Sequence, residues 1–133
     1  MASGVFGDLD TRHLDKHNKL LLADFTCQDK VFGQITSPKG TVTDFATIYS
    51  MQSLLLFVIF ALLAGYGDKA ATIHDYLYGG GRPDTGLYIS RYEADNVYLR
   101  ALRNEGVAEW RAYIFYYGVR VFGRGHWYEN VKQ

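Results

Sequence analysis

The side chains best suited to acid–base chemistry lie at two places in the second half of the chain. His74 is followed directly by Asp75, and Arg91 and Asp95 come later with i,i+4 spacing. A histidine near carboxylates is the commonest general-base arrangement, because one carboxylate fixes the imidazole tautomer while the other ring nitrogen accepts a proton. These residue types therefore predict proton abstraction by a neutral imidazole.

Helical periodicity places His74 on a face that should be buried. A helix is expected over residues 69–78, and its apolar stripe would consist of Ala70, Ala71, Ile73, His74, Leu77 and Tyr78. His74 lies near the middle of this stripe, and Asp75 lies about 100° further round, at its edge. A histidine in an apolar stripe tends to stay neutral, as a general base must.

The next helix should bring a second set of charges to the same side. It is expected to begin at a capping box with Ser90 as the N-cap and Glu93 at the third helical position. Its stripe would consist of Ala94, Val97, Tyr98, Ala101 and Leu102. Arg91 falls inside the stripe, and Asp95 at its margin is expected to pair with Arg91. Asp44, at the end of an expected strand, could bring one more carboxylate to this place.

Two interpretations of the cluster stay open at this point. Charges that face a core must meet partners, because the burial of an unpaired charge is costly. The commoner outcome is a structural ion-pair network that fixes the packing of two helices. The alternative is an active site in which His74 is the base.

Length and composition predict a single α+β domain over residues 1–133. The chain has the usual size of one domain, and 48% of its residues are hydrophobic, which is enough for one core. Lys+Arg and Asp+Glu number 14 each, so no basic surplus supports binding to nucleic acid or anchoring to an acidic membrane surface. The single cysteine, Cys27, excludes an internal disulfide and a cysteine metal cluster, and we expect it to be a packing residue.

Turn residues and hydrophobic patterning predict a small N-terminal antiparallel β-sheet followed by about four helices. Strands are expected at 19–26, 31–36 and 41–45, with turns at 28–30 and 37–40. Helices are expected at 50–64, 69–78, from Ser90 to Gly106, and at 108–122. The uncharged apolar run 54–64 is shorter than the roughly 20 residues that a membrane span needs, so we expect a buried helix; a span over 51–64 is the minor alternative.

Other polar or aromatic candidates are weaker. His13 and His17 have the spacing of two metal ligands on a helix, but the segment around them is highly polar and lacks a third ligand. A solvated loop or turn is therefore expected there. His126 and Trp127 are expected to belong to a packed tail.

Several motifs in order along the chain resemble a small domain family of tailed bacteriophages and prophages, the domain of unknown function 1353. Residues 38–48, PKGTVTDFATI, are similar to its "PxGxxTDFASxP" signature, with Tyr49 where the family usually has proline. Residues 70–78 resemble its "AAxxHDxLY" segment, and 90–95 its "SR…AD" step. Residues 119–123, VRVFG, resemble its ending together with Trp127. The resemblance covers roughly residues 6–127 and implies a phage or prophage origin without supplying a function.

A shorter pattern is similar to the phospholipases A2. His74-Asp75-x-x-Tyr78, with Asp95 one helix later, resembles their His-Asp helix pair. This resemblance implies that His74 is the base, Asp75 a calcium ligand and Asp95 the carboxylate that orients His74, with Tyr78 hydrogen-bonded to Asp95. The chain departs from the pattern because it lacks the interhelix disulfides and the usual glycine-rich calcium loop.

The expected function is a virion-associated structural or assembly protein of a bacteriophage that acts through contacts with other phage proteins. The 11 tyrosines and the balanced charge agree with protein contacts. We expect it in the virion or in the cytoplasm of the infected host, without nucleic acid, and a homo-oligomer is compatible with this role.

The alternative function is a metal-assisted hydrolase of an ester. Its catalytic residues would be His74, Asp95, Tyr78 and Arg91. Asp75 and Asp44 would hold a divalent cation, calcium in the phospholipase-like case. Arg91 argues against the metal, because a cation beside Asp75 would compete with it.

Overall fold

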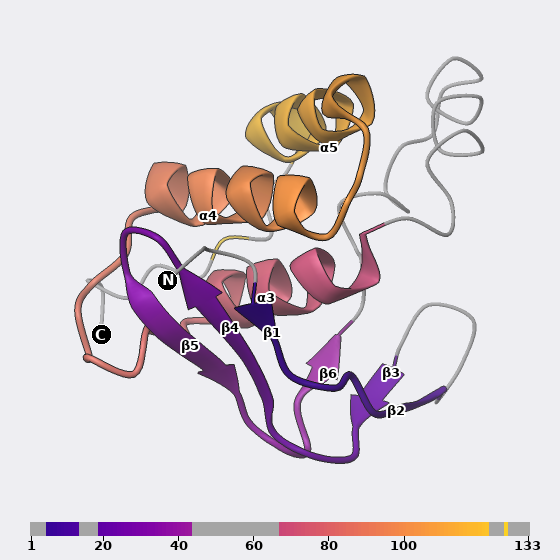
Figure 1. The fold of residues 1–133 in the computed structure, drawn as a ribbon. Helices are drawn as coiled ribbons and strands as arrows, with labels where there is room; N and C mark the ends of the chain where they lie inside the picture. Colours follow the sequence, from indigo (N-terminus) through magenta and orange to yellow (C-terminus); the bar gives the residue numbers. More distant parts are fainter. Residues whose placement is uncertain (1–4, 14–18, 44–66, 123–126, 128–133) are drawn as a thin grey trace.

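The computed structural model describes residues 5–13, 19–43, 67–122 and 127 (Figure 1). Strands come first and helices second in this part of the chain, which confirms the predicted α+β class. The strands are β1 (Val5–Phe6), β2 (Thr11–His13), β3 (Lys19–Leu21), β4 (Phe25–Asp29), β5 (Gly33–Ser37) and β6 (Val42–Thr43). The helices are α3 (Asp68–Tyr78), α4 (Arg91–Asn104) and α5 (Glu109–Phe122).

The strands form two small antiparallel sheets, and the expectation of one sheet was wrong. Their orders are β1-β4-β5 and β2-β3-β6. The strand expected at 19–26 is divided between them, because the chain turns after Leu21. Leu22 is exposed, and Asp24 accepts a hydrogen bond from the backbone N–H of Lys39 at 2.7 Å, which holds the corner. His13 lies in β2 opposite Lys19, so the expectation of a loop or turn was wrong at His13.

The turn between β4 and β5 lies two residues later than expected. Asp29 Oδ2 accepts hydrogen bonds from the backbone N–H groups of Val31 and Phe32 at 2.9 and 3.0 Å, which moves the turn to 30–32. Both oxygens of this carboxylate also accept from Arg100 on α4, each at 2.9 Å. The side chain of Asp29 therefore closes the hairpin and attaches it to the helices.

Three expectations fall outside the described residues. They are the helix at 50–64, the carboxylate of Asp44, and the side chains of His17 and His126. Within the described ranges, no helix is long and apolar enough to cross a membrane. Trp127 is described, and its ring meets the ring of Tyr78 edge-on, with centroids 5.2 Å apart, as a packed tail requires.

The helices form a layer in which α4 lies between α3 and α5 (Figure 1). All residues of the predicted α3 stripe are buried, and so are those of the α4 stripe. One core cluster joins α3 and α4 to the strands through Phe25, Cys27 and Ile35. A second joins α4 and α5 through Tyr98, Leu102 and Phe115. Cys27 is therefore a packing residue, as predicted.

The start of α3 is capped by a side chain from another helix. Gly67 is the N-cap, and as a glycine it makes no side-chain hydrogen bond. It has a φ of 78°, and a Cβ there would lie 2.7 Å from Leu102 Cδ2. Glu105, just after α4, accepts instead from the backbone N–H groups of Lys69 and Ala70 at 3.3 and 2.9 Å. The end of α4 is thereby fixed to the start of α3.

We expect Glu105→Ala to lower the free energy of unfolding by about 1 kcal/mol, the usual cost of a lost helix cap. Glu105→Gln is the matched control, since its amide oxygen can still accept one hydrogen bond, and it should lose less than half as much. Both values come from urea denaturation. Equal stability of Glu105→Ala and wild type would show that this cap contributes nothing.

Candidate active site

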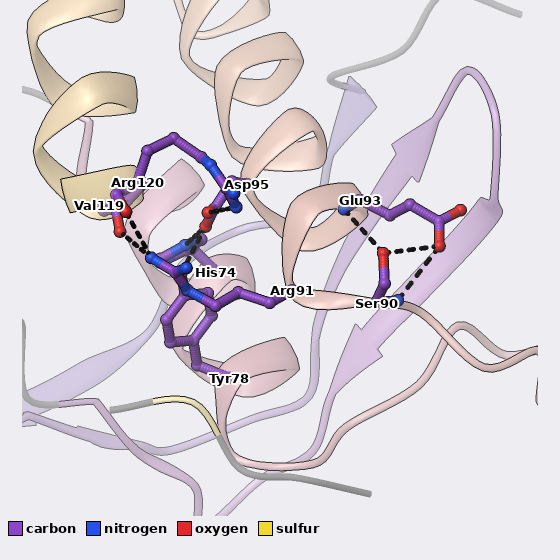
Figure 2. Close-up of polar contacts among 8 residues, drawn as sticks. All are labelled: His74, Tyr78, Ser90, Arg91, Glu93, Asp95, Val119 and Arg120. Carbon is purple, nitrogen blue, oxygen red and sulfur yellow. Dashed lines mark hydrogen bonds and ion pairs between the residues drawn. The ribbon is translucent and has the colours of Figure 1, made fainter. Parts of the chain in front are cut away.

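Polar side chains from all three helices converge on one buried carboxylate, Asp95 (Figure 2). Asp95 has an exposed fraction of 0%. His74 and Tyr78 of α3 both reach its Oδ1, from Nε2 at 2.8 Å and from the hydroxyl at 2.6 Å. Arg120 of α5 donates from Nη1 to Oδ2 at 2.7 Å. Both oxygens of the carboxylate are therefore engaged.

The ring of His74 is held in place by aromatic neighbours. His74 and Tyr78 are one helical turn apart on α3, so they share a face, and their ring centroids are 4.1 Å apart. Tyr98 of α4 stacks on the imidazole with centroids 4.5 Å apart and an interplanar angle of 29°. These contacts leave only 4% of His74 exposed.

The protonation state of the site follows from burial and hydrogen bonding. Burial alone would raise the pKa of Asp95, but the hydrogen bonds from His74, Tyr78 and Arg120 outweigh it, and the pKa lies below its usual value. Asp95 is therefore a carboxylate near neutral pH. Burial lowers the pKa of His74 below 6.5 and outweighs the hydrogen bond and negative charge of Asp95, which favour an imidazolium; the positive charge of Arg91 lowers it further. Burial and the bond to Asp95 also raise the pKa of Tyr78, which stays a donor.

These states determine the tautomer of His74. An ionised carboxylate can only accept hydrogen bonds, so Nε2 of a neutral His74 must carry the proton. Nδ1 then holds a lone pair, and no group in the described residues donates to it. This is the tautomer that a general base requires.

Arg91 does not form the expected pair with Asp95. Its Nε donates to the Tyr78 hydroxyl at 3.1 Å, and its Nη2 donates to the carbonyls of Val119 and Arg120, each at 2.7 Å. Carbonyls in the last turn of a helix lack partners within the helix and carry partial negative charge. Arg91 therefore caps the end of α5 and steadies Tyr78, while Arg120 provides the ion pair.

Arg120 is the site residue that the sequence reasoning missed. It follows Val119, a buried position of α5 in step with Ala112 and Phe115, and it falls in the segment that resembles the family ending. This position beside a buried stripe was a usable signal. The packing of α5 against α4, which brings Arg120 to Asp95, could not be predicted from the hydrophobic pattern.

Of the two predicted metal ligands, Asp75 and Asp44, the structure describes only Asp75. Asp75 lies next to His74, half-buried, and acts electrostatically on the nearby Tyr98 hydroxyl, whose pKa is raised mainly by burial. Asp44 lies outside the described residues. Among the residues described, no group of three or more His, Cys, Asp or Glu side chains could hold a metal ion. Asp75 is an oxygen ligand of the type that calcium prefers, but it does not make a site alone.

The lowered pKa of His74 predicts a specific loss of stability in acid. The unfolded chain takes up this proton near pH 6.5, whereas the native protein does so only at lower pH. Stability must therefore fall as the pH drops below 6.5, by up to about 1.4 kcal/mol per pH unit for one group. We expect wild type to lose more stability than His74→Gln between pH 6.5 and 5.5 in urea denaturation. A smaller loss in wild type would mean that the native pKa is raised.

The comparisons with known proteins identify the family. A family model described as "Protein of unknown function (DUF1353)" matches residues 20–119, which is most of the chain. The chain belongs to the DUF1353 family. No curated protein matches this DUF1353 chain, and no solved structure does. His74, Tyr78, Arg91 and Asp95 lie inside the match, and Arg120 is the residue that follows it. The network thus joins three of the segments that carry the resemblance, residues 70–78, 90–95 and 119–123.

Proposed function

We propose that this DUF1353 protein is a hydrolase in which His74 activates a water molecule for attack on an ester. The observation that carries the proposal is the bond between His74 Nε2 and the fully buried carboxylate of Asp95, which leaves Nδ1 as the proton acceptor. A neutral imidazole oriented by a carboxylate is the usual form of a general base.

The reaction would proceed in two steps. His74 Nδ1 takes a proton from water while the water oxygen attacks the carbonyl carbon, and the carbonyl electron pair moves to its oxygen. The tetrahedral intermediate then collapses, the bond to the alkoxy oxygen breaks, and the imidazolium returns its proton to the leaving alcohol. Asp95 stabilises the transient imidazolium through Nε2 and does not itself take up a proton.

Tyr78 and Arg91 support the dyad without meeting substrate. The Tyr78 hydroxyl donates to Asp95 and accepts from Arg91 Nε, which fixes the carboxylate against rotation. This part of the geometry agrees with what the resemblance to phospholipases A2 implies for His74, Asp95 and Tyr78. An ester is therefore the substrate class we propose, and Asp75 is the residue we would test for calcium.

An ester assay with and without calcium tests the function. The purified chain is incubated with a soluble short-chain ester and with phospholipid micelles, each with and without millimolar calcium. We expect hydrolysis above the buffer rate with at least one substrate. If Asp75 holds calcium, calorimetry will show binding by wild type and not by Asp75→Asn. No hydrolysis of either substrate in either condition would refute the proposed function.

A second candidate function, assembly through protein contacts, is favoured by the outer face of α5. Large exposed side chains recur along this helix at one-turn spacing, and they are Trp110, Tyr113, Tyr117 and Val121. Tyr and Trp are enriched in protein interfaces. With the phage origin that the motifs suggest, the partners would be other virion proteins. Mass spectrometry of purified virions tests this role. Virions that do not contain the protein would contradict it.

A further inference from the structure

The charge of Asp95 is balanced by one residue on a different helix. His74 and Tyr78 approach the carboxylate as neutral donors, and Arg91 is directed to Tyr78 and to the end of α5. Arg120 Nη1, at 2.7 Å from Oδ2, is the cation in direct contact with this carboxylate among the described residues. The negative charge of Asp95 is thus balanced by a side chain from α5.

We propose that Arg120 is a positioning residue of the site, which keeps Asp95 ionised as the hydrogen-bond acceptor of His74 Nε2 and thereby keeps the lone pair of the neutral ring on Nδ1. This inference rests on the proposed function of His74. It adds a residue that the His-Asp-Tyr pattern does not contain and gives α5 a part in the chemistry.

The electrostatic reason is the cost of a lone buried charge. Without Arg120, a fully buried carboxylate would face only neutral hydrogen-bond donors, so a proton would bind to the His74–Asp95 pair at a higher pH. A proton on His74 would remove the lone pair of the base. A protonated Asp95 would instead donate a hydrogen bond to Nε2. The ring hydrogen of the neutral His74 would then lie on Nδ1. Either event would disable the base at neutral pH.

The surroundings hold the Arg120 guanidinium in place. It stacks over the ring of Tyr92 at 5.3 Å, and the backbone carbonyl of Arg120 accepts from Arg91. Its side chain keeps an exposed fraction of 29%, so it lies at the edge of the buried cluster. In the part of the chain that the structure describes, the titratable or charged groups around Asp95 are His74 and Tyr78 from α3, Arg91 and Tyr98 from α4, and Tyr116 and Arg120 from α5.

The test is an NMR titration of the His74 ring nitrogens and the Asp95 carboxyl carbon in the full chain. We expect Arg120→Gln to raise the apparent pKa at which the pair takes up a proton by about 1–3 units, the usual effect of an adjacent arginine on a carboxylate. Arg120→Lys retains the charge and should restore most of the wild-type value. Arg103→Gln, which removes an exposed arginine paired with Glu109, should leave the titration unchanged.

A charge-removal test covers the case in which Arg120→Gln does not fold. If the lone carboxylate is the cause, then the double variant Arg120→Gln/Asp95→Asn will be more stable than Arg120→Gln alone. A folded Arg120→Gln whose pair titrates like wild type would overturn the inference, and so would a double variant that is no more stable. Neither readout needs a substrate, so the positioning role can fail or hold independently of the hydrolase proposal.

Discussion

Replacing His74 with glutamine will lower kcat for ester hydrolysis by about 10²–10⁴-fold, the usual contribution of a general base. The amide of glutamine can occupy the place of Nε2 and donate to Asp95, so the buried hydrogen bond of 2.8 Å can be kept. It has no basic nitrogen at the position of Nδ1. The variant should therefore fold and bind substrate while losing the chemical step.

Tyr98→Phe is the matched control for this change. Tyr98 stacks on the His74 ring, and phenylalanine preserves that contact while removing only a hydroxyl. We expect its kcat to stay within about 3-fold of wild type, a small effect against the contribution of the base. If His74→Gln kept full activity, or if both variants lost activity equally, His74 would not be the base.

Replacing Asp95 with alanine should have the largest effect on stability. The change leaves His74, Tyr78 and Arg120 without their shared acceptor in the core. Breaking a buried ion pair costs about 3–5 kcal/mol, and we expect about 3 kcal/mol because the Arg120 side chain is 29% exposed and can reach water. Urea denaturation at pH 7 measures the loss.

Asp95→Asn separates the stability of the network from its chemistry. The amide has the shape of the carboxylate but no charge, so it should destabilise the protein less than alanine does. Its NH₂ group can donate to Nε2 and drive the proton to Nδ1, which would lower kcat by about 10²–10⁴-fold. An Asp95→Ala protein as stable as wild type would show that the network does not hold the helices together.

The two helices that position the dyad were predictable because their patterns are local. The stripes of α3 and α4 depend on a period of 3.6 residues, and a capping box sets the start of α4. The box forms as predicted, with Ser90 accepting from the backbone of Glu93. The burial of His74 and Asp95 and their contact follow from these two patterns.

The parts that were wrong depend on contacts distant in sequence. The corner at Leu22 is held by a hydrogen bond that Asp24 accepts from the backbone N–H of Lys39. The turn after β4 is held by Asp29, which also pairs with Arg100. The ion-pair partner of Asp95 is Arg120 and not the expected Arg91, and this difference also depends on contacts distant in sequence. Spacing along one helix favoured Arg91, but the end of α5 offers it unpaired carbonyls and brings Arg120 over the carboxylate.

The tautomer and charge of His74 in the wild-type protein test the central claim most directly. A ¹⁵N-edited NMR spectrum of the imidazole at pH 7 distinguishes a protonated from an unprotonated ring nitrogen. We expect hydrogen on Nε2, a bare Nδ1, and a pKa below 6.5 as the pH is lowered. An imidazolium at pH 7, or a neutral ring with hydrogen on Nδ1, would contradict His74 as the general base.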